Sequence, residues 1–294
     1  SKEEKERKPN LSGHQKLFLH KAARRTWLFF EEFVKAEENW LPPDNFQELP
    51  APVIAHRTSP TNMGLALLAN LAAYDFGYIS GSEMAERCKS TVGTMRRMER
   101  YDGHFYNWYD TLSLMPLQPK YVSTIDSGNL VGHLLTLRQG LISQANEPVF
   151  KKSVYEGLLT TLEIVQENAG KRLAEEIQKI EALLSAAFTD NNNSLSNAKK
   201  YFDELSALID DLSLIPGDAE VKKWISKLSV QLEKFYDDLF ELVPWINLLP
   251  VPENFEKLDI LDDIPSLHTI RGQSKFLETN NFYQQKENND ANDE

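Results

Sequence analysis

Apolar residues recur at three- and four-residue intervals along most of this chain, and this spacing limits what the chain can fold into. The period places apolar side chains on one face of an α-helix. The sequence therefore predicts an all-α fold with at most short strands. A first helix carries this face at Leu19, Ala23, Trp27, Phe30, Phe33 and Val34.

The helix that follows Ser59 is predicted to be the most deeply buried one. The Ser59 hydroxyl can cap free amides, and Pro60 suits the first helical position. Its apolar residues leave almost no polar face, as in the inner ring of a helical barrel: Met63, Leu65, Leu67, Leu68, Leu71 and Ala72. Two further helical patterns run over residues 82–98 and 123–141.

The second half of the chain reads as plain amphipathic helix. Breaks at residues 190–194 and at Pro216-Gly217 divide it. We expect a helical hairpin or bundle packed against the first half; a coiled-coil surface for a partner remains an alternative. Its stripes are Val154, Leu158, Leu162 and Val165; Leu173, Ile177, Ile180, Leu184 and Phe188; and Trp224, Leu228, Phe235, Leu239 and Leu242.

Changes in composition divide the chain into four parts. Residues 1–10 form a charged tail, and residues 11–141 form a helical lobe that carries the motif-like loops. Residues 142–275 are the amphipathic bundle extension. Residues 276–294 are acidic and rich in Asn, with almost nothing apolar after Phe282, so we expect a disordered tail.

Charge and cysteine content exclude several classes of partner and site. The formal net charge of −12 argues against a nucleic-acid surface, which needs clustered Lys and Arg. The single cysteine, Cys88, allows neither an internal disulfide nor a cysteine-rich zinc site. The histidines lack zinc-type spacing and no glycine-rich phosphate loop occurs, so no metal or cofactor is expected. No apolar run approaches the roughly 20 residues that span a bilayer, so we expect no membrane contact by this segment.

Two polar loops follow the first helix. In the first, a proline pair holds Asp44, Asn45 and Gln47 in a stiff frame that suits sugar hydroxyls. In the second, Arg57 and Thr58 lie at the mouth of the buried helix, where the forked guanidinium can bridge sugar oxygens or orient a carboxylate. Two plainer interpretations stay open: a helix-stop turn for the first loop and a salt bridge that holds the second.

A third loop combines aromatic and polar residues. As an extended segment it alternates between two faces. Aromatic rings beside carboxylate and amide groups suit a pyranose, whose C–H faces stack on rings; an aromatic core ribbon is the alternative. One face carries Phe105, Asn107 and Tyr109, and the other carries His104, Tyr106, Trp108 and Asp110.

The fourth loop opens the helical pattern that begins near Ser123. Ser123 and Asp126 have the spacing of a capping box. Alternatively, Asp126 faces the same pocket as Asp110. Glycoside chemistry needs two carboxyl groups, which makes Asp110 and Asp126 the catalytic candidates of this sequence.

Five strings together resemble the cyclic β-1,2-glucan synthases, in the region between their glycosyltransferase and phosphorylase-like parts. They are RTWLFFEEFV (residues 25–34), LPPDNFQE (41–48), HRTSPTNMGL (56–65), GHFYNWYDT (103–111) and YVSTIDSGNLVGHL (121–134). The resemblance is sharp over residues 26–141, whereas the second half matches only in character.

The resemblance implies the N-terminal half of a carbohydrate-active domain: a partial (α/α)6-toroid-like fold followed by the bundle extension. The family closes linear β-1,2-glucan into a ring by retaining transglycosylation. It implies a β-glucan chain as ligand, the remainder of a larger synthase or a second copy as partner, and a cytoplasmic location on an inner-membrane-associated parent. The residues implied to line the cleft are Asp44, Asn45, Gln47, Arg57, Thr58, Tyr106, Asn107, Trp108, Asp110 and Asp126.

Two functions remain open on the sequence. In the first, the chain contributes glucan-binding residues to a retaining transglycosylase or glycosidase site, with the main catalytic carboxylates expected beyond this chain. In the second, it is a non-catalytic glucan-binding or structural helical module. Whether the chain turns over glucan by itself, and which residues are acid and base, stays open.

Overall fold

The computed structural model describes residues 11–191, 194–248 and 262–272, and their fold is mostly helical, which confirms the all-α prediction. The predicted tails, residues 1–10 and 276–294, lie outside these ranges. The described α-helices are α1 (Gly13–Phe33), α2 (Pro60–Asp75), α3 (Gly81–Arg97), α4 (Thr124–Gln144), α5 (Ser153–Ala169), α6 (Ala174–Thr189), α7 (Leu195–Ser213) and α8 (Ala219–Leu242). Short 3-10 helices are η1 (Ala36–Glu38), η2 (Gly170–Leu173) and η3 (Pro244–Leu248).

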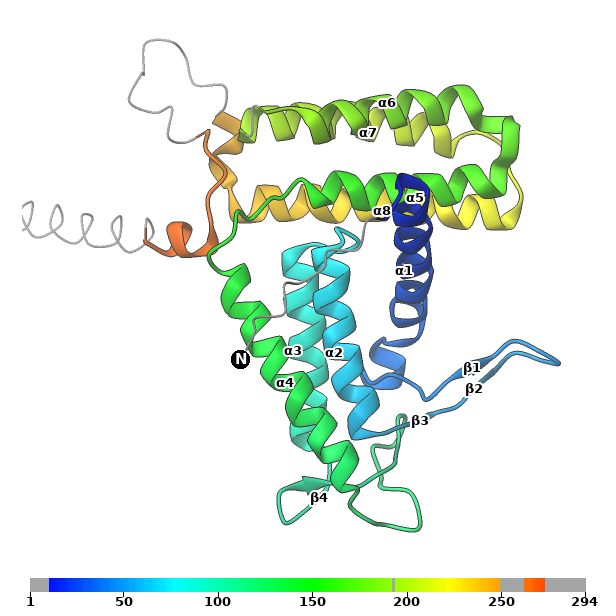
Figure 1. The fold of residues 1–294 in the computed structure, drawn as a ribbon, viewed down its shortest axis with the longest axis vertical. Helices are drawn as coiled ribbons and strands as arrows, with labels where there is room; N and C mark the ends of the chain where they lie inside the picture. Colours follow the sequence, from blue (N-terminus) through cyan, green and yellow to red (C-terminus); the bar gives the residue numbers. More distant parts are fainter. Residues whose placement is uncertain (1–10, 192–193, 249–261, 273–294) are drawn as a thin grey trace, which may run out of the picture.

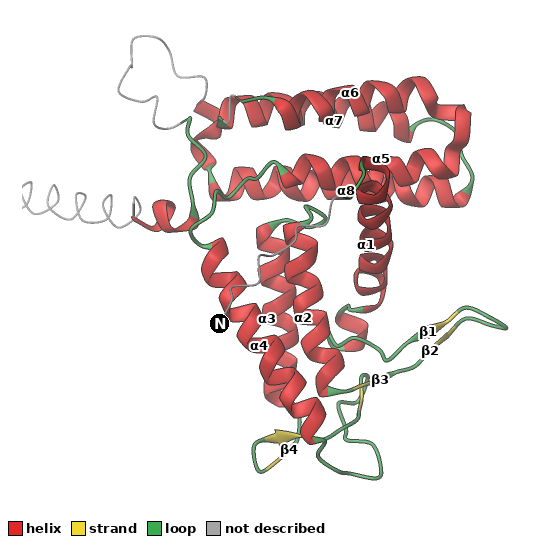
Figure 2. Ribbon diagram, in the orientation of Figure 1, coloured by secondary structure: helices red, strands yellow, loops and turns green. Residues whose placement is uncertain are grey.

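The helices form two layers that cross each other. In Figure 1, α5–α8 lie crosswise over the upper ends of α1–α4. The connections of α1–α4 at their lower ends carry the strands, far from the second layer (Figure 2). The strands form antiparallel pairs, which are β1 (Phe46–Gln47) with β2 (Val53–Ile54), β3 (Arg57–Thr58) with β6 (Tyr109–Asp110), and β4 (Arg100–Tyr101) with β5 (His104–Phe105).

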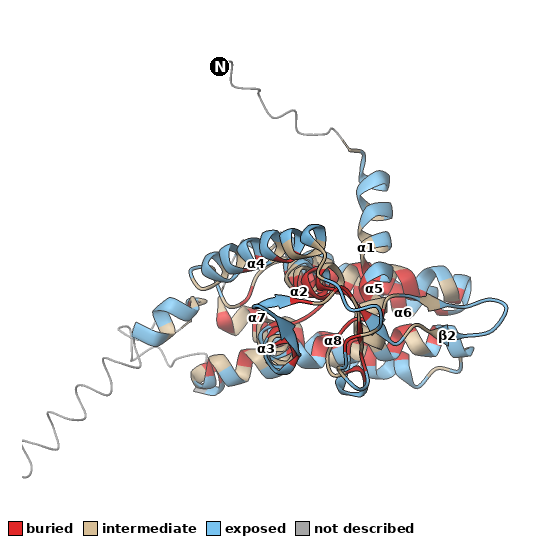
Figure 3. Cartoon of the chain, turned by 90° about the horizontal axis from the view of Figure 1, so that it is seen from below, coloured by how far each residue is buried: buried red, intermediate tan, exposed pale blue. Residues whose placement is uncertain are grey.

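The core of the first layer is built around α2, which packs against α1, α3 and α4. Figure 3 shows its strongly buried character. The predicted start signal holds, because the Ser59 hydroxyl accepts a 3.2 Å hydrogen bond from the amide of Asn62 and Pro60 is the first helical residue. The side chains of this core include Trp27, Leu41, Met63, Leu67, Met84, Tyr109, Leu130 and Leu137.

The core of the second layer lies between α5, α6, α7 and α8, each packed against two of the others. The stripes predicted from the sequence line this core, except that Phe188 near the end of α6 is exposed and Leu242 at the end of α8 is half-buried. The predicted breaks coincide with the helix ends: Ser194 caps α7, and Asp218, next to Gly217, caps α8.

A chain of buried polar contacts joins the two layers. Arg24 of α1 donates from Nε to Thr161 Oγ1 of α5 at 3.1 Å. The Thr161 hydroxyl donates to Gln231 Oε1 of α8 at 2.7 Å, and Gln231 Nε2 donates to the carbonyl of Gly77 between α2 and α3 at 2.7 Å. At this point the backbone of α5 passes very close to the connection between α2 and α3. Gly157 permits this, because a Cβ atom there would lie 2.0 Å from the Gly77 carbonyl oxygen.

The outward side of α4 is apolar and uncovered within the described part of the chain. Only Leu130 and Leu137 of this helix are buried. The exposed apolar residues of α4, which we call the α4 face, are Ile125, Val131, Leu134, Leu135, Leu141 and Ile142. None of the helices in the described ranges combines the length and apolar character that crossing a bilayer requires.

Because Gly157 lies against the Gly77 backbone, we expect a methyl group added at Gly157 to destabilise the folded protein strongly. Gly157→Ala forces two backbones apart, and we expect it to lower the free energy of unfolding by about 3 kcal/mol. Gly93→Ala is the matched control, because a Cβ atom added to Gly93 in α3 would meet nothing within 4 Å. The control should gain about 0.5–1 kcal/mol from helix propensity. Urea unfolding of both variants measures this, and equal effects would refute the close approach.

Candidate functional site

Short backbone pairings bring the four polar loops together at one end of the first layer. The β3–β6 pair sets Arg57 opposite Asp110 and Thr58 opposite Tyr109. The first and second loops are joined because the amide of Asp44 donates to the Ala55 carbonyl at 3.1 Å. The third and fourth are joined because the amide of Asn107 donates to the Tyr121 carbonyl at 2.9 Å. The four loops therefore lie together at this end of the first layer.

Arg57 and Asp44 form an ion pair at the centre of this end. Arg57 donates from Nη2 and Nε to Asp44 Oδ2 at 2.9 and 3.2 Å. Its guanidinium carbon lies 4.9 Å from the centroid of the Trp108 ring, within cation–π range. Asn62 of α2 donates to the other Asp44 oxygen at 3.2 Å. The Arg57 side chain is 51% accessible and that of Asp44 is 21% accessible, so a ligand can reach the guanidinium.

A second group of contacts continues from Trp108 to the start of α4. With the Asn107 amide oriented to match its neighbours, its oxygen accepts from Trp108 Nε1 at 2.6 Å and its nitrogen donates to Asp126 Oδ2 at 2.9 Å. Asp126 Oδ1 accepts from the Thr61 hydroxyl of α2 at 2.6 Å. Arg57, Trp108, Asn107 and Asp126 therefore belong to one connected network, which we call the Arg57–Asp126 network.

The side chains of the third loop alternate between two faces, as the sequence predicts, and the structure shows that one of these faces is buried. Phe105, Asn107 and Tyr109 are buried, whereas Trp108 and Asp110 are half-buried on the other side. The Tyr109 hydroxyl donates to the Glu99 carbonyl at 2.6 Å and accepts from the amide of Tyr106 at 2.8 Å. Burial raises the pKa of Tyr109 to about 12, so this phenol stays neutral and holds the loop in shape.

Asp110 caps a turn in its own loop. Its Oδ1 accepts from the amides of Ser113 and Leu112 at 2.7 and 3.0 Å and from the Ser113 hydroxyl at 2.9 Å. Burial acts to raise the pKa of Asp110, but these hydrogen bonds and the nearby His56 outweigh it and hold the pKa below its ordinary value. A carboxyl group with a lowered pKa is ionised at neutral pH and does not suit the role of a general acid.

Asp126 has half of the predicted capping box. The Ser123 hydroxyl accepts from the amide of Asp126 at 3.1 Å, as that motif requires. The Asp126 carboxylate, however, accepts from Thr61 and Asn107, so it turns toward the network and away from the backbone of its own helix.

The other predicted residues lie in different surroundings. Thr58 is fully buried opposite Tyr109. Its side chain therefore does not reach the surface, whereas the sequence predicts that it lines the cleft. Asn45 is exposed and donates to Asp44 at 3.2 Å. Gln47 is exposed on the β1–β2 hairpin, which extends away from the body in Figure 1. Tyr106 is half-buried, with the ammonium of Lys120 5.3 Å from its ring centroid.

Sequence reasoning missed the buried carboxylate of Glu38. Its Oε1 lies 2.7 Å from His56 Nδ1, and its Oε2 accepts a short hydrogen bond from the Thr111 hydroxyl. Glu38 turns inward because Asn39 and Trp40 both adopt positive φ angles, 53° and 60°. Left-handed backbone is rare outside glycine; Asn39 is of a type that adopts it more often than most, whereas Trp40 is not, so the sequence gives a signal at only one of the two positions. In the sequence, Glu38 follows Glu37 in a short polar segment and so has the appearance of a surface acid.

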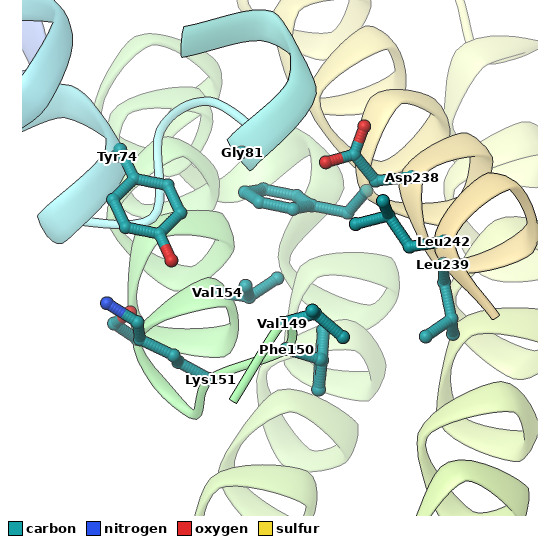
Figure 4. Close-up of a pocket in the computed structure, with 11 residues that line it drawn as sticks. Tyr74, Gly81, Val149, Phe150, Lys151, Val154, Asp238, Leu239 and Leu242 are labelled. Atoms are coloured by element: carbon teal, nitrogen blue, oxygen red, sulfur yellow. The ribbon is translucent and has the colours of Figure 1, made fainter. Parts of the chain in front are cut away.

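A small hollow lies between the two layers of helices, away from the Arg57–Asp126 network. Figure 4 shows Tyr74 and Lys151 on one side and Asp238, Leu239 and Leu242 on the other. Its volume of about 20 Å³ is little more than the space of one water molecule, so it is a packing seam. No cluster of three or more His, Cys, Asp or Glu side chains suitable for a metal ion occurs among the described residues.

Comparison with known proteins identifies a protein that is clearly related to this chain in sequence. No family model matches the chain. Cyclic β-(1,2)-glucan synthase NdvB of Rhizobium meliloti (strain 1021) is 38% identical over 219 residues, which is 73% of this chain and 8% of that protein. The chain therefore matches only a small part of its relative's length.

Among solved structures, a "putative glucoamylase" of Bacteroides fragilis NCTC 9343 matches 79% of this chain and 38% of its own, with 16% identity and a TM-score of 0.30. A structural likeness of that size does not establish a relationship. The sequence identity does, because this chain is homologous to a part of cyclic β-(1,2)-glucan synthase NdvB, which confirms the resemblance to the cyclic β-1,2-glucan synthases.

Proposed function

We propose that this chain is the N-terminal lobe of a glucan-processing domain and contributes the Arg57–Asp126 network to a site that holds a β-1,2-glucan chain. The observation that carries the proposal is the convergence of Asp44, Arg57, Trp108 and Asp126, from four separate loops, into one connected surface group. Homology to a β-1,2-glucan synthase supports a sugar as the ligand of that surface.

The chemistry of the network suits sugar hydroxyls. Arg57 uses Nε and Nη2 to bind Asp44, and within the described part of the chain it makes no other hydrogen bond, so Nη1 can donate to a ligand. The contact from Trp108 Nε1 to Asn107 fixes the indole, which then offers a pre-oriented apolar wall. Rigid aromatic surface beside a few fixed polar groups is what a carbohydrate site requires, because ordering costs little on binding.

A site that cleaves or transfers glucan also needs catalytic carboxyl groups, and the aspartates of the four loops are the candidates within this chain. A retaining transglycosylase or glycosidase needs a nucleophile and a general acid whose pKa is raised. The lowered pKa of Asp110 disfavours it as that acid. We therefore place the general acid outside this chain, with Asp126 as the remaining candidate for a carboxylate that acts on the sugar.

The same observation favours a second candidate function, a glucan-binding module without activity of its own. Incubation of the purified chain with linear β-1,2-glucan separates the two, with product analysis and calorimetry on the same sample. Binding without cyclic or shortened product supports the module. Product from the chain alone refutes it, and neither binding nor product refutes both functions.

The architecture proposed for the complete domain is an (α/α)6 ring that begins with α1–α4. The α4 face supports this proposal, because a helix that is apolar on its outward side needs a covering neighbour. We assign that cover to the remainder of a larger synthase polypeptide, since the chain matches only 8% of the relative's length.

Trp108→Ala tests the binding surface. Loss of the indole removes the apolar wall and one support of Arg57, so we expect glucan affinity to fall about 30-fold, the effect of losing one strong contact. Helical content should stay unchanged, since Trp108 lies in a loop and is half-buried. Phe18→Ala is the control, because Phe18 is exposed near the opposite end of α1. Calorimetry and circular dichroism measure both properties; unchanged affinity, or an unfolded variant, refutes the assignment of Trp108.

Asp110→Asn tests whether this carboxylate serves the loop or the ligand. A carboxyl group whose folded-state pKa is lowered stabilises the protein above its ordinary pKa, and that stability is lost as pH falls through the lowered value. We expect the variant to be about 1–2 kcal/mol less stable at pH 7, and we expect this difference in stability to shrink as the pH falls below the ordinary pKa of an aspartate and the wild-type carboxylate is protonated. Thermal unfolding across this range measures the difference, with Asp211→Asn on the exposed side of α7 as control. Full stability with lost glucan binding would mean that Asp110 acts on the sugar.

Leu135→Asp tests the assignment of the α4 face. If another part of a longer polypeptide covers the α4 face, this chain alone should be monomeric and should bind the apolar dye ANS at the α4 face. The Leu135→Asp variant should then bind less ANS. Leu214→Asp is the control, because Leu214 is exposed between α7 and α8, away from α4. Light scattering decides the matter: a wild-type dimer that Leu135→Asp dissociates would assign the face to a second copy.

A further inference from the structure

A second hollow adjoins the Arg57–Asp126 network and is not used by it. It has a volume of about 340 Å³, close to the lower limit of ordinary ligand pockets, roughly 300 Å³. Its walls come from the β4–β5 hairpin and from residues 120–122. We call it the tyrosine pocket, after Tyr101, Tyr106 and Tyr121, which line it together with Asp102, His104 and Lys120.

The hairpin geometry directs Tyr101 and His104 to the same side. Asp102 and Gly103 form its two-residue turn, with φ angles of 50° and 85°, as a tight hairpin of this kind requires. Tyr101 pairs directly with His104, and paired residues share one face of a sheet. The neighbouring pair points the other way: the Arg100 guanidinium covers the buried Phe105 ring at 4.3 Å. The outward pair is therefore held in place by an inward anchor.

Two of the three tyrosines of this pocket have exposed side chains. Tyr101 is 64% exposed and Tyr121 is 49% exposed. Lys120 is held above the Tyr106 ring by an ion pair with Glu99 at 3.0 Å. Phenol rings beside an ammonium, an imidazole and a carboxylate offer apolar faces with polar edges. That combination matches a neutral pyranose, which has C–H faces and a rim of hydroxyls.

Tyr121 connects the pocket to the network. Its ring lines the pocket, while its hydroxyl donates to the Asn107 oxygen at 2.7 Å, and that oxygen also accepts from Trp108. Trp108 of the network and Tyr121 of the pocket therefore bind the same atom, so the pocket lies one residue, Asn107, away from the indole. The volume fits about one or two sugar rings.

We infer that the tyrosine pocket is a further subsite that binds pyranose units of the same β-1,2-glucan chain, beyond those held at Arg57 and Trp108. The inference rests on the proposed function. It makes the site select for length: a two-unit glucan reaches only the network, whereas a longer chain also occupies the pocket.

Tyr101→Ala tests this subsite, with calorimetric titration of wild type and variants by the two-glucose β-1,2 disaccharide and by linear β-1,2-glucan of about ten units. We expect Tyr101→Ala to weaken binding of the long glucan about 10-fold and to leave the disaccharide unchanged. Tyr101→Phe keeps the ring and should restore affinity for the long chain. Trp108→Ala should weaken both ligands, and Phe18→Ala neither.

Each contrary result has a distinct meaning. Unchanged long-chain affinity in Tyr101→Ala overturns the subsite, while the proposed function stands if Trp108→Ala still weakens binding. Equal loss for both ligands in a variant with native circular dichroism also overturns it, because Tyr101 then belongs to the first binding position. No binding of either glucan by the wild-type chain overturns the proposed function and the subsite together.

Discussion

The buried guanidinium of Arg24 is the contact on which the arrangement of the two layers depends. An ionised side chain that is 1% exposed is tolerated only with partners, and Arg24 takes them from both layers. Glu31 accepts from it at 3.2 Å, Thr161 accepts at 3.1 Å, and the rings of Tyr78 and Trp224 lie 5.6 and 5.2 Å from its guanidinium carbon. Separation of the layers would leave this charge without half of its partners, so the two cores behave as one body.

That body supplies a rigid base for the loops at the opposite end of α1–α4. Thr61 and Asp126 stand in the first turns of α2 and α4, where helix packing fixes their positions. The contact between them ties both helix starts to Asn107, and the β3–β6 pair adds Arg57. The network is therefore positioned by helix termini and by one short strand pair, which hold side chains more closely than free loops do.

The sequence was sufficient for features that depend on local spacing. The apolar repeats predicted the helices, the Ser59-Pro60 signal predicted the start of α2, and the alternation of residues 104–110 predicted which side chains share a face. Features that depend on the direction of the backbone were not predictable. Thr58 is buried because β3 pairs with β6, and Glu38 is buried because two residues after it are left-handed. Periodicity carries no information on either.

The contacts between the layers also impose an order on folding. Asp238 of α8 accepts from the amide of Ser82 at the start of α3 across 156 positions of sequence, and Gln231 reaches Gly77 across 154. Loops of this length close slowly. On the ribosome, α3 emerges long before the residue that completes its N-terminus. The first layer, although synthesised first, thus gains these contacts only after α8 has been synthesised, and a nascent chain arrested before α8 would leave this side of the first layer open to chaperones.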